Sequence, residues 1–147
     1  MNFFPKKILL ATDDSDDARL AAEAAVDLSN ETGSELHVVY VALTSPWMTP
    51  DAMNPGEAER LREQAQRVLD KQVRWVEEKG GTITEAHLET GYKASHEIIR
   101  LAEEINAGII VVGSRGLGAV ERILLGDDSE SVVRHAPCPV LVVREQK

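Results

Sequence analysis

Short apolar runs alternate with amphipathic stretches along the whole chain. Four of the runs are almost entirely apolar, which is typical of strands buried on both faces, and one alternates polar and apolar residues, as a strand near a sheet edge does. The four apolar runs are 7–13, 35–43, 109–112 and 139–144, and the alternating one is 82–89. Strands separated by helical stretches predict a parallel sheet that is covered on both faces.

The first helical stretch carries start and stop signals. Ser15 is a candidate N-cap, and Asp16 and Asp17 follow in the first turn, where the helix dipole favours negative charge. Gly33 is placed to end the helix as its C′ residue. The predicted inner stripe consists of small or apolar residues: Ala18, Ala21, Ala22, Ala25 and Leu28.

Three further helices are expected, at 57–79, around 94–105 and at 127–136. Gly80 and Gly81 end the first of these. Its predicted inner stripe is Leu61, Ala65, Val68, Leu69, Gln72 and Val76, and that of the next helix is Ala94, Ile98, Leu101, Ala102 and Ile105. The segment 44–56 contains three prolines and no periodicity, and it is interpreted either as a surface crossover or as a flap over a site that is mobile when empty.

These elements predict one α/β domain over residues 1–147, doubly wound, with a five-stranded parallel sheet of order 3-2-1-4-5 and helices on both faces. In such sheets ligands bind beyond the carboxyl ends of the strands, where the strand order reverses. That point lies between the first and fourth strands. We therefore expect Asp13 and Gly113, which follow or end these strands, to face each other there.

Residues suited to ligand binding cluster after the fourth predicted strand. A glycine-rich turn, GSRGLG, occupies 113–118, and Gly126 precedes a helix-start signature, Asp127-Asp128-Ser129-Glu130. Glycines let backbone N–H groups approach an anion closely, and a helix N-terminus adds unpaired donors and partial positive charge. The pattern predicts a phosphate-binding loop that needs no lysine.

These residues resemble the universal stress protein family over the length of the chain. The resemblance rests on ILLATDDS, on LHVVYV, and above all on GSRGLGAVERILLG with the VVRHAPCPVLVVR that follows. The nucleotide-binding members carry Gly-x2-Gly-x9-Gly-(Ser/Thr), and Gly113, Gly116 and Gly126 match its glycines in type and spacing. The resemblance implies a cytoplasmic, stress-related regulatory protein that binds ATP or a related adenine nucleotide. It also implies a homodimer formed through the last strand, by Val140, Leu141, Val142 and Val143.

The resemblance also implies a set of binding residues. Asp13 would lie against the ribose or adenine, the backbone around Val41 would bind the adenine edge, and the glycine-rich turn would follow the phosphates. The full set is Ala11, Thr12, Asp13, Val41, Val112, Gly113, Arg115, Gly116, Gly126, Asp127, Asp128 and Ser129.

One position departs from the family pattern. Asp127 stands where the motif has Ser or Thr, and a carboxylate repels phosphate where a hydroxyl donates to it. Asp13, Asp14 and Asp128 add further negative charge to the same mouth. Mg²⁺ near Asp13 or Asp127 would reconcile these charges with a phosphate. Alternatively, Asp127 and Glu130 form a variant of the capping box that satisfies the helix's own donors.

Composition excludes several other functions. The net charge of −9 argues against nucleic acid and anionic membranes as partners, and the longest apolar runs are too short to span a bilayer. The single Cys138 fits a reducing compartment, no GxxxxGK[ST] is present, and no spacing of His, Cys and Asp is typical of zinc. Ser129 and His135 lie six residues apart on one helix, so they are not expected to form a triad with Asp128.

Three functions remain open: a nucleotide-responsive regulator, a nucleotide-free dimeric interaction module of the same fold, and a weak ATP hydrolase. The sequence offers no positioned general base, so it gives the third little support and favours a protein that is not an enzyme.

Overall fold

A computed structural model describes residues 5–13, 15–44, 54–114 and 127–144. Its centre is a five-stranded sheet of order β3-β2-β1-β4-β5 in which every neighbouring pair is parallel. The strands are β1 (Lys7–Thr12), β2 (Glu35–Leu43), β3 (Ile83–Gly91), β4 (Ile109–Gly113) and β5 (Val140–Val143). The predicted sheet and its strand order are confirmed.

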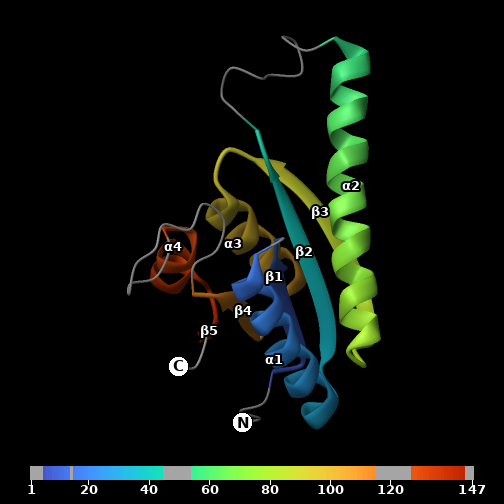
Figure 1. The fold of residues 1–147 in the computed structure, drawn as a ribbon. Helices are drawn as coiled ribbons and strands as arrows, with labels where there is room; N and C mark the ends of the chain where they lie inside the picture. The colour runs from blue at the N-terminus through green and yellow to red at the C-terminus, as the bar shows by residue number, and fades with distance from the viewer. Residues whose placement is uncertain (1–4, 14, 45–53, 115–126, 145–147) are drawn as a thin grey trace.

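Helices cover both faces of the sheet (Figure 1). On one face lie α1 (Asp16–Thr32) and α2 (Pro55–Glu78), and on the other lie α3 (Ala94–Ile105) and α4 (Asp127–His135). None of the described helices is long and apolar enough to span a membrane. The predicted doubly wound arrangement is therefore confirmed.

Side chains of each central strand divide between two cores, because successive residues of a strand point to opposite faces. Ile8 and Leu10 of β1 pack under α1 and α2, whereas Leu9 packs under α3 and α4. All three are fully buried. The near-continuous apolar strands of the sequence thus reflect burial on both sides.

Helix limits follow local capping chemistry. The Ser15 side chain accepts a hydrogen bond from the N–H of Ala18 (3.1 Å), which makes Ser15 the N-cap of α1. Gly33 adopts a left-handed conformation (φ 73°) and its N–H donates to Ser29 O (2.9 Å), so it ends α1 as predicted. At the end of α3 the left-handed residue is Asn106 (φ 56°).

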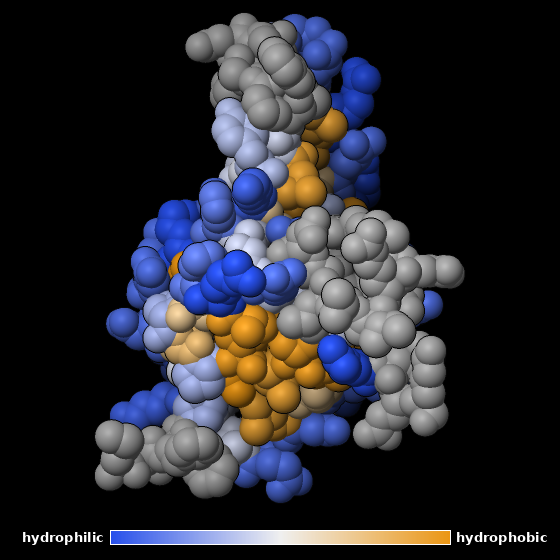
Figure 2. Space-filling model, turned by 90° about the vertical axis from the view of Figure 1, so that its left-hand side faces the viewer, coloured by the Kyte–Doolittle hydropathy of each residue, from blue (hydrophilic) through white to orange (hydrophobic). Residues whose placement is uncertain are grey.

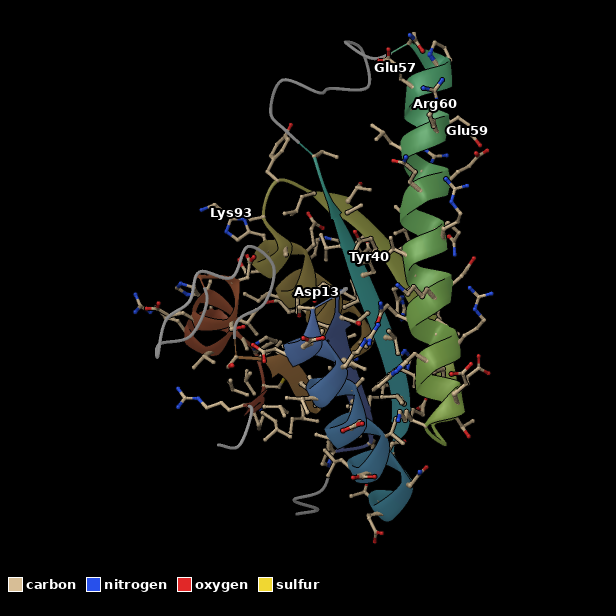
Figure 3. The ribbon with its side chains drawn as sticks, in the orientation of Figure 1. Asp13, Tyr40, Glu57, Glu59, Arg60 and Lys93 are labelled. Carbon is tan, nitrogen blue, oxygen red and sulfur yellow. The ribbon has the colours of Figure 1, made fainter. Side chains whose placement is uncertain are left out.

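The second helix differs from expectation at its start. It begins two residues early, at Pro55, because the Asn54 side chain accepts from the N–H of Glu57 (2.8 Å) and proline suits the first helical position. Leu61 was expected to face inward, and this prediction is wrong, since it is 40% exposed. The first turns of α2 extend beyond the ends of the strands that the structure describes (Figure 1). Figure 3 labels Glu57, Glu59 and Arg60 at this end.

Candidate functional site

A cavity opens at the carboxyl ends of β1 and β4, where the strand order reverses. Eight of the twelve residues expected at the site line it. They are Ala11, Thr12, Asp13, Val41, Val112, Gly113, Asp128 and Ser129. Of the other four, Arg115, Gly116 and Gly126 lie outside the described residues, and Asp127 begins α4 but its side chain is likewise outside them.

Asp13 lies just beyond the end of β1, at the centre of the molecule (Figure 3). Its side chain is 5% exposed, and Oδ1 accepts a hydrogen bond from the N–H of Ser15 (2.7 Å). This hydrogen bond ties the end of the strand to the N-cap of α1 and holds the carboxylate at the cavity. Asp14, the next residue of the expected acidic mouth, lies outside the described part of the chain.

The end of β4 passes very close to α1. A Cβ on Gly113 would lie 2.8 Å from the carbonyl carbon and oxygen of Asp17, so no larger residue fits there without displacing backbone. The hydroxyl of Ser129 donates to Gly113 O (2.6 Å) from the other side. The hydroxyl of Ser114 lies 3.5 Å from Asp17 Oδ2. These contacts fix the strand from which the glycine-rich segment departs.

Asp128 joins two helix starts. Its Oδ1 accepts a hydrogen bond from the N–H of Ser95 (3.3 Å), in the first turn of α3. Such a contact between residues 33 positions apart has no signature in the sequence. Both carboxylates at the cavity therefore accept a hydrogen bond from a backbone N–H, Asp128 from Ser95 and Asp13 from Ser15.

A second, wider hollow of about 300 Å³ adjoins the cavity, and the two share Ala94 and Asp128. Lys93, the residue before α3 and labelled in Figure 3, lines this hollow. Lys93 makes no side-chain cap to α3. Lys93 was not among the residues predicted for the site, and it adds a cation next to the cavity that Asp13 and Asp128 line.

Three helices, α1, α3 and α4, begin around the cavity. Their first N–H groups and dipoles place partial positive charge at the carboxyl edge of the sheet, which is the electrostatic setting of an anion site. The deeper walls are apolar. Ala18, Val39, Ala94, Ile98 and Val132 form them, and none of these was singled out for the site. The sequence contains one signal for this wall, because Val39 lies on the same strand face as Val41, which was predicted for the site.

The other sequence hypotheses for this region can be compared with its contacts. Ser129 is 2% exposed and bonded to Gly113, whereas His135 is exposed, so the two do not form a nucleophilic pair. Glu130 accepts from Arg134 Nη2 (2.9 Å), one turn on. The Glu130 carboxylate, which a capping box would need at the start of α4, therefore pairs with Arg134 on the exposed face of the helix.

Comparisons with known proteins match the chain to a single protein family. The model of the "Universal stress protein family" matches residues 5–144. Universal stress protein MJ0531 of Methanocaldococcus jannaschii is 40% identical over 144 residues, which cover 97% of this chain and 84% of that protein.

Solved structures agree. Universal stress protein UspA from Lactobacillus plantarum superimposes with a TM-score of 0.75 at 28% identity, over 95% of this chain and 97% of that one. The universal stress protein from Archaeoglobus fulgidus in complex with dAMP shares the fold, with a TM-score of 0.69 at 22% identity, over 95% of this chain and 98% of that one.

Proposed function

The chain belongs to the universal stress protein family, and we propose that it is a stress-related regulator that binds ATP or a related adenine nucleotide in the cavity between β1 and β4. One observation carries the proposal. A buried carboxylate, Asp13, an apolar wall and three helix N-termini converge on a single cavity at the switch point of the sheet. Such convergence of a few polar groups on an apolar pocket is typical of a cofactor site.

The parts of the cavity suit the parts of a nucleotide. Val39, Val41 and Val112 offer the flat apolar surface that a base requires, and Asp13 offers an acceptor for a ribose hydroxyl or the adenine amine. The N-terminus of α4 and the glycine-rich segment after Gly113 suit the phosphates. The A. fulgidus relative bound to dAMP supports an adenine nucleotide as the ligand.

The test compares two substitutions that remove the same charge. Asp13→Asn keeps the oxygen that accepts from Ser15, so the turn survives, but it replaces a charged acceptor with a neutral one. We expect ATP affinity to fall about fivefold, since the difference between charged and neutral hydrogen bonds is about 1 kcal/mol. Asp27→Asn, exposed about three turns further along α1, is the control and should leave affinity unchanged. Titration calorimetry measures both.

If wild-type protein binds neither ATP nor AMP at millimolar concentration and carries no nucleotide after purification, the nucleotide proposal fails. The dimeric, nucleotide-free interaction module then takes its place.

We further propose that Mg²⁺ accompanies the nucleotide. Asp13 and Asp128, which line the cavity, offer the hard oxygen ligands that Mg²⁺ prefers, and Asp127 adds a carboxylate at the position where the family's nucleotide-binding motif has Ser or Thr. Two unit charges about 4 Å apart repel by roughly 1 kcal/mol in water and 4 at an effective dielectric near 20. Asp127→Ser should therefore tighten ATP binding at least about tenfold and reduce its dependence on Mg²⁺. Equal binding of ATP by both proteins without metal would contradict this.

We also propose that the protein is a homodimer through β5. This strand pairs only with β4 among the described strands and so has one open edge. Figure 2 shows a broad apolar surface on the side of the molecule where β5 and α4 lie, and the exposed Val133 and Leu141 belong to these elements. A two-fold axis at this edge would pair the strand with its own copy and cover that surface.

A further inference from the structure

Three titratable side chains meet on β2 and β3, away from the nucleotide cavity. His37 lies directly opposite Glu85 in the parallel register, and His87 follows two residues later on the same face of β3. One ligand atom from each of the three lies within 4.8 Å of the others. The two histidines are 50 residues apart in the chain, and only the sheet register brings them together.

The cluster runs from the interior to the surface. His37 is 4% exposed, the His87 side chain 11% and the Glu85 side chain 63%. Two imidazoles are therefore held inside the protein while a carboxylate stands at the rim. An ion can enter from solvent past Glu85 and still be held by groups that cannot rotate freely.

The separation of the imidazole nitrogens fits a shared metal ion. His37 Nδ1 and His87 Nε2 are 3.2 Å apart. Two nitrogens bound tetrahedrally to zinc at about 2.0–2.1 Å lie roughly 3.3–3.4 Å from each other, so little movement is needed. The Glu85 carboxylate, 3.9 Å from His87 Nε2, is near enough to complete a third ligand position.

Without a metal the cluster is incompletely satisfied. The two rings then share one N–H···N hydrogen bond, and His37 Nε2 is buried without a hydrogen-bond partner among the residues that the structure describes. The Glu35 carboxylate lies 3.4 Å from this nitrogen. Metal on Nδ1 fixes the ring proton on Nε2, facing Glu35, and this is the usual arrangement in which a carboxylate orients a metal-binding histidine.

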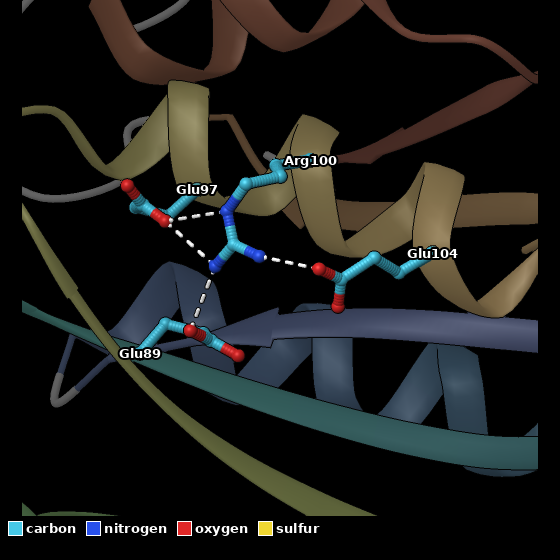
Figure 4. Close-up of polar contacts among 4 residues, drawn as sticks. All are labelled: Glu89, Glu97, Arg100 and Glu104. Carbon is cyan, nitrogen blue, oxygen red and sulfur yellow. Dashed lines mark hydrogen bonds and ion pairs between the residues drawn. The ribbon is translucent and has the colours of Figure 1, made fainter.

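The surrounding charge favours a cation. Glu89 and Glu104 act on His87 together with Glu85, and Glu35 stands behind His37. Two positive groups on the surrounding elements already have partners. Arg100 pairs with Glu89, Glu97 and Glu104 (Figure 4), and Lys7 donates to Ile105 O (3.0 Å). Burial lowers the pKa of the His87 imidazole, and the nearby Glu85 carboxylate opposes this shift.

We propose that His37, His87 and Glu85 bind one divalent transition-metal ion of the zinc class, clamping β3 to β2, with Glu35 as a positioning residue. The proposal is independent of nucleotide binding. Imidazole and carboxylate are common ligands of zinc, and the exposed side of the cluster leaves the fourth position to water.

The test uses Zn²⁺ alone, titrated against a chromogenic chelator in nucleotide-free protein. Wild-type protein should bind one Zn²⁺ per chain, and binding should raise the melting temperature. His87→Ala should weaken affinity at least 100-fold. Glu35→Gln should weaken it about tenfold, as loss of an orienting carboxylate typically does. His135→Ala removes an exposed histidine on α4 and should change nothing.

Circular dichroism and urea unfolding of the metal-free variants establish that each is folded before its affinity is compared. Co²⁺ should give the intense visible bands of tetrahedral coordination in wild type and lose them in His87→Ala. If His87→Ala binds Zn²⁺ as well as wild type does, or if wild type binds it no more tightly than about 100 µM, the proposed site is wrong.

Discussion

The two edge strands of the sheet differ in length and in the charge of their side chains. Edge strand β3 has nine residues and edge strand β5 has four. Glu85 and Glu89 project from β3, whereas β5 reads Val-Leu-Val-Val without a polar side chain. An unpaired strand edge is a template for association, and charged side chains are a common means of blocking it. One edge is thus protected and the other is open.

The protection of β3 comes from a helix as well as from the strand. Arg100 of α3 donates to Glu89 (2.8 Å), Glu97 (3.0 and 2.8 Å) and Glu104 (2.7 Å), and so places a network of four charged residues over one face of the strand (Figure 4). Glu97 is the strongest cause of the raised pKa of Arg100. A second chain adding to this edge would have to desolvate these groups.

Alternate residues of the edge strand β5 direct their backbone N–H and C=O groups to opposite sides. The carbonyl oxygens of Pro139 and Val143 accept from the N–H groups of Ile110 and Ser114, both at 3.0 Å. Because alternate residues of a parallel strand bond to the same neighbour, Leu141 belongs to the set that faces β4. The backbone groups of Val140 and Val142 therefore point to the open side. The sequence alone left this choice undecided, and it determines the sharpest test of the dimer.

The largest effect is expected from proline at the open edge. Val142→Pro removes an outward N–H from each copy and should raise the dimer dissociation constant about 100-fold, from two lost hydrogen bonds of about 1 kcal/mol and the clash of two rings. Leu141→Pro is the matched variant. It removes a donor to β4, so it should lower the melting temperature of the chain. Light scattering and thermal melting separate the two effects.

The proposed association of two chains through β5 is contradicted if both prolines leave the dimer intact, or if wild-type protein is monomeric at micromolar concentration. It is also contradicted if Val142→Pro unfolds the chain while Leu141→Pro does not. The N–H of Val142 would then face β4, and that of Leu141 would face the open side.

A smaller effect is expected from giving β5 the kind of residue that protects β3. Leu141 is 37% exposed, and Leu141→Lys would bring two like charges to the two-fold axis of the dimer. We expect the dimer to weaken about tenfold, with the loss reduced at high salt because exposed charges are screened. Leu141→Met, which keeps the volume and the apolar character, should associate as wild type does. Sedimentation at two ionic strengths measures the difference, and equal association of both variants would refute the prediction.

The sequence predicted the strands, their order and most helix ends, because these depend on hydrophobic period and on residues such as Ser15 and Gly33 that act locally. It also predicted that Asp13, Gly113 and Ser129 would meet. It failed at Leu61, because helical period says nothing about where the sheet below a helix ends. The contact of Asp128 with Ser95, and that of His37 with His87, could not be found, because each depends on a register between distant segments.

The smallest effect is expected from the network over β3, and it tests whether that network protects the edge or also stabilises the fold. Arg100→Met keeps most of the aliphatic stem and leaves Glu89, Glu97 and Glu104 without their shared cation. Exposed ion pairs contribute about 0.2–1 kcal/mol each, and these three share one side chain that is 44% exposed. We expect the free energy of unfolding to fall by about 1 kcal/mol in urea, and by less in high salt.

Arg134→Met is the control for Arg100→Met. Among the described residues Arg134 pairs with Glu130 alone, on an exposed helix face, so this substitution should cost less than about 0.5 kcal/mol. If the two variants are equally stable, the network adds nothing beyond an ordinary surface pair. Its role would then be confined to keeping other chains away from β3, which Arg100→Met should reveal as slow aggregation of the folded protein. A variant that neither loses stability nor aggregates would remove the asymmetry between the edges, and with it the reason for expecting association through β5 alone.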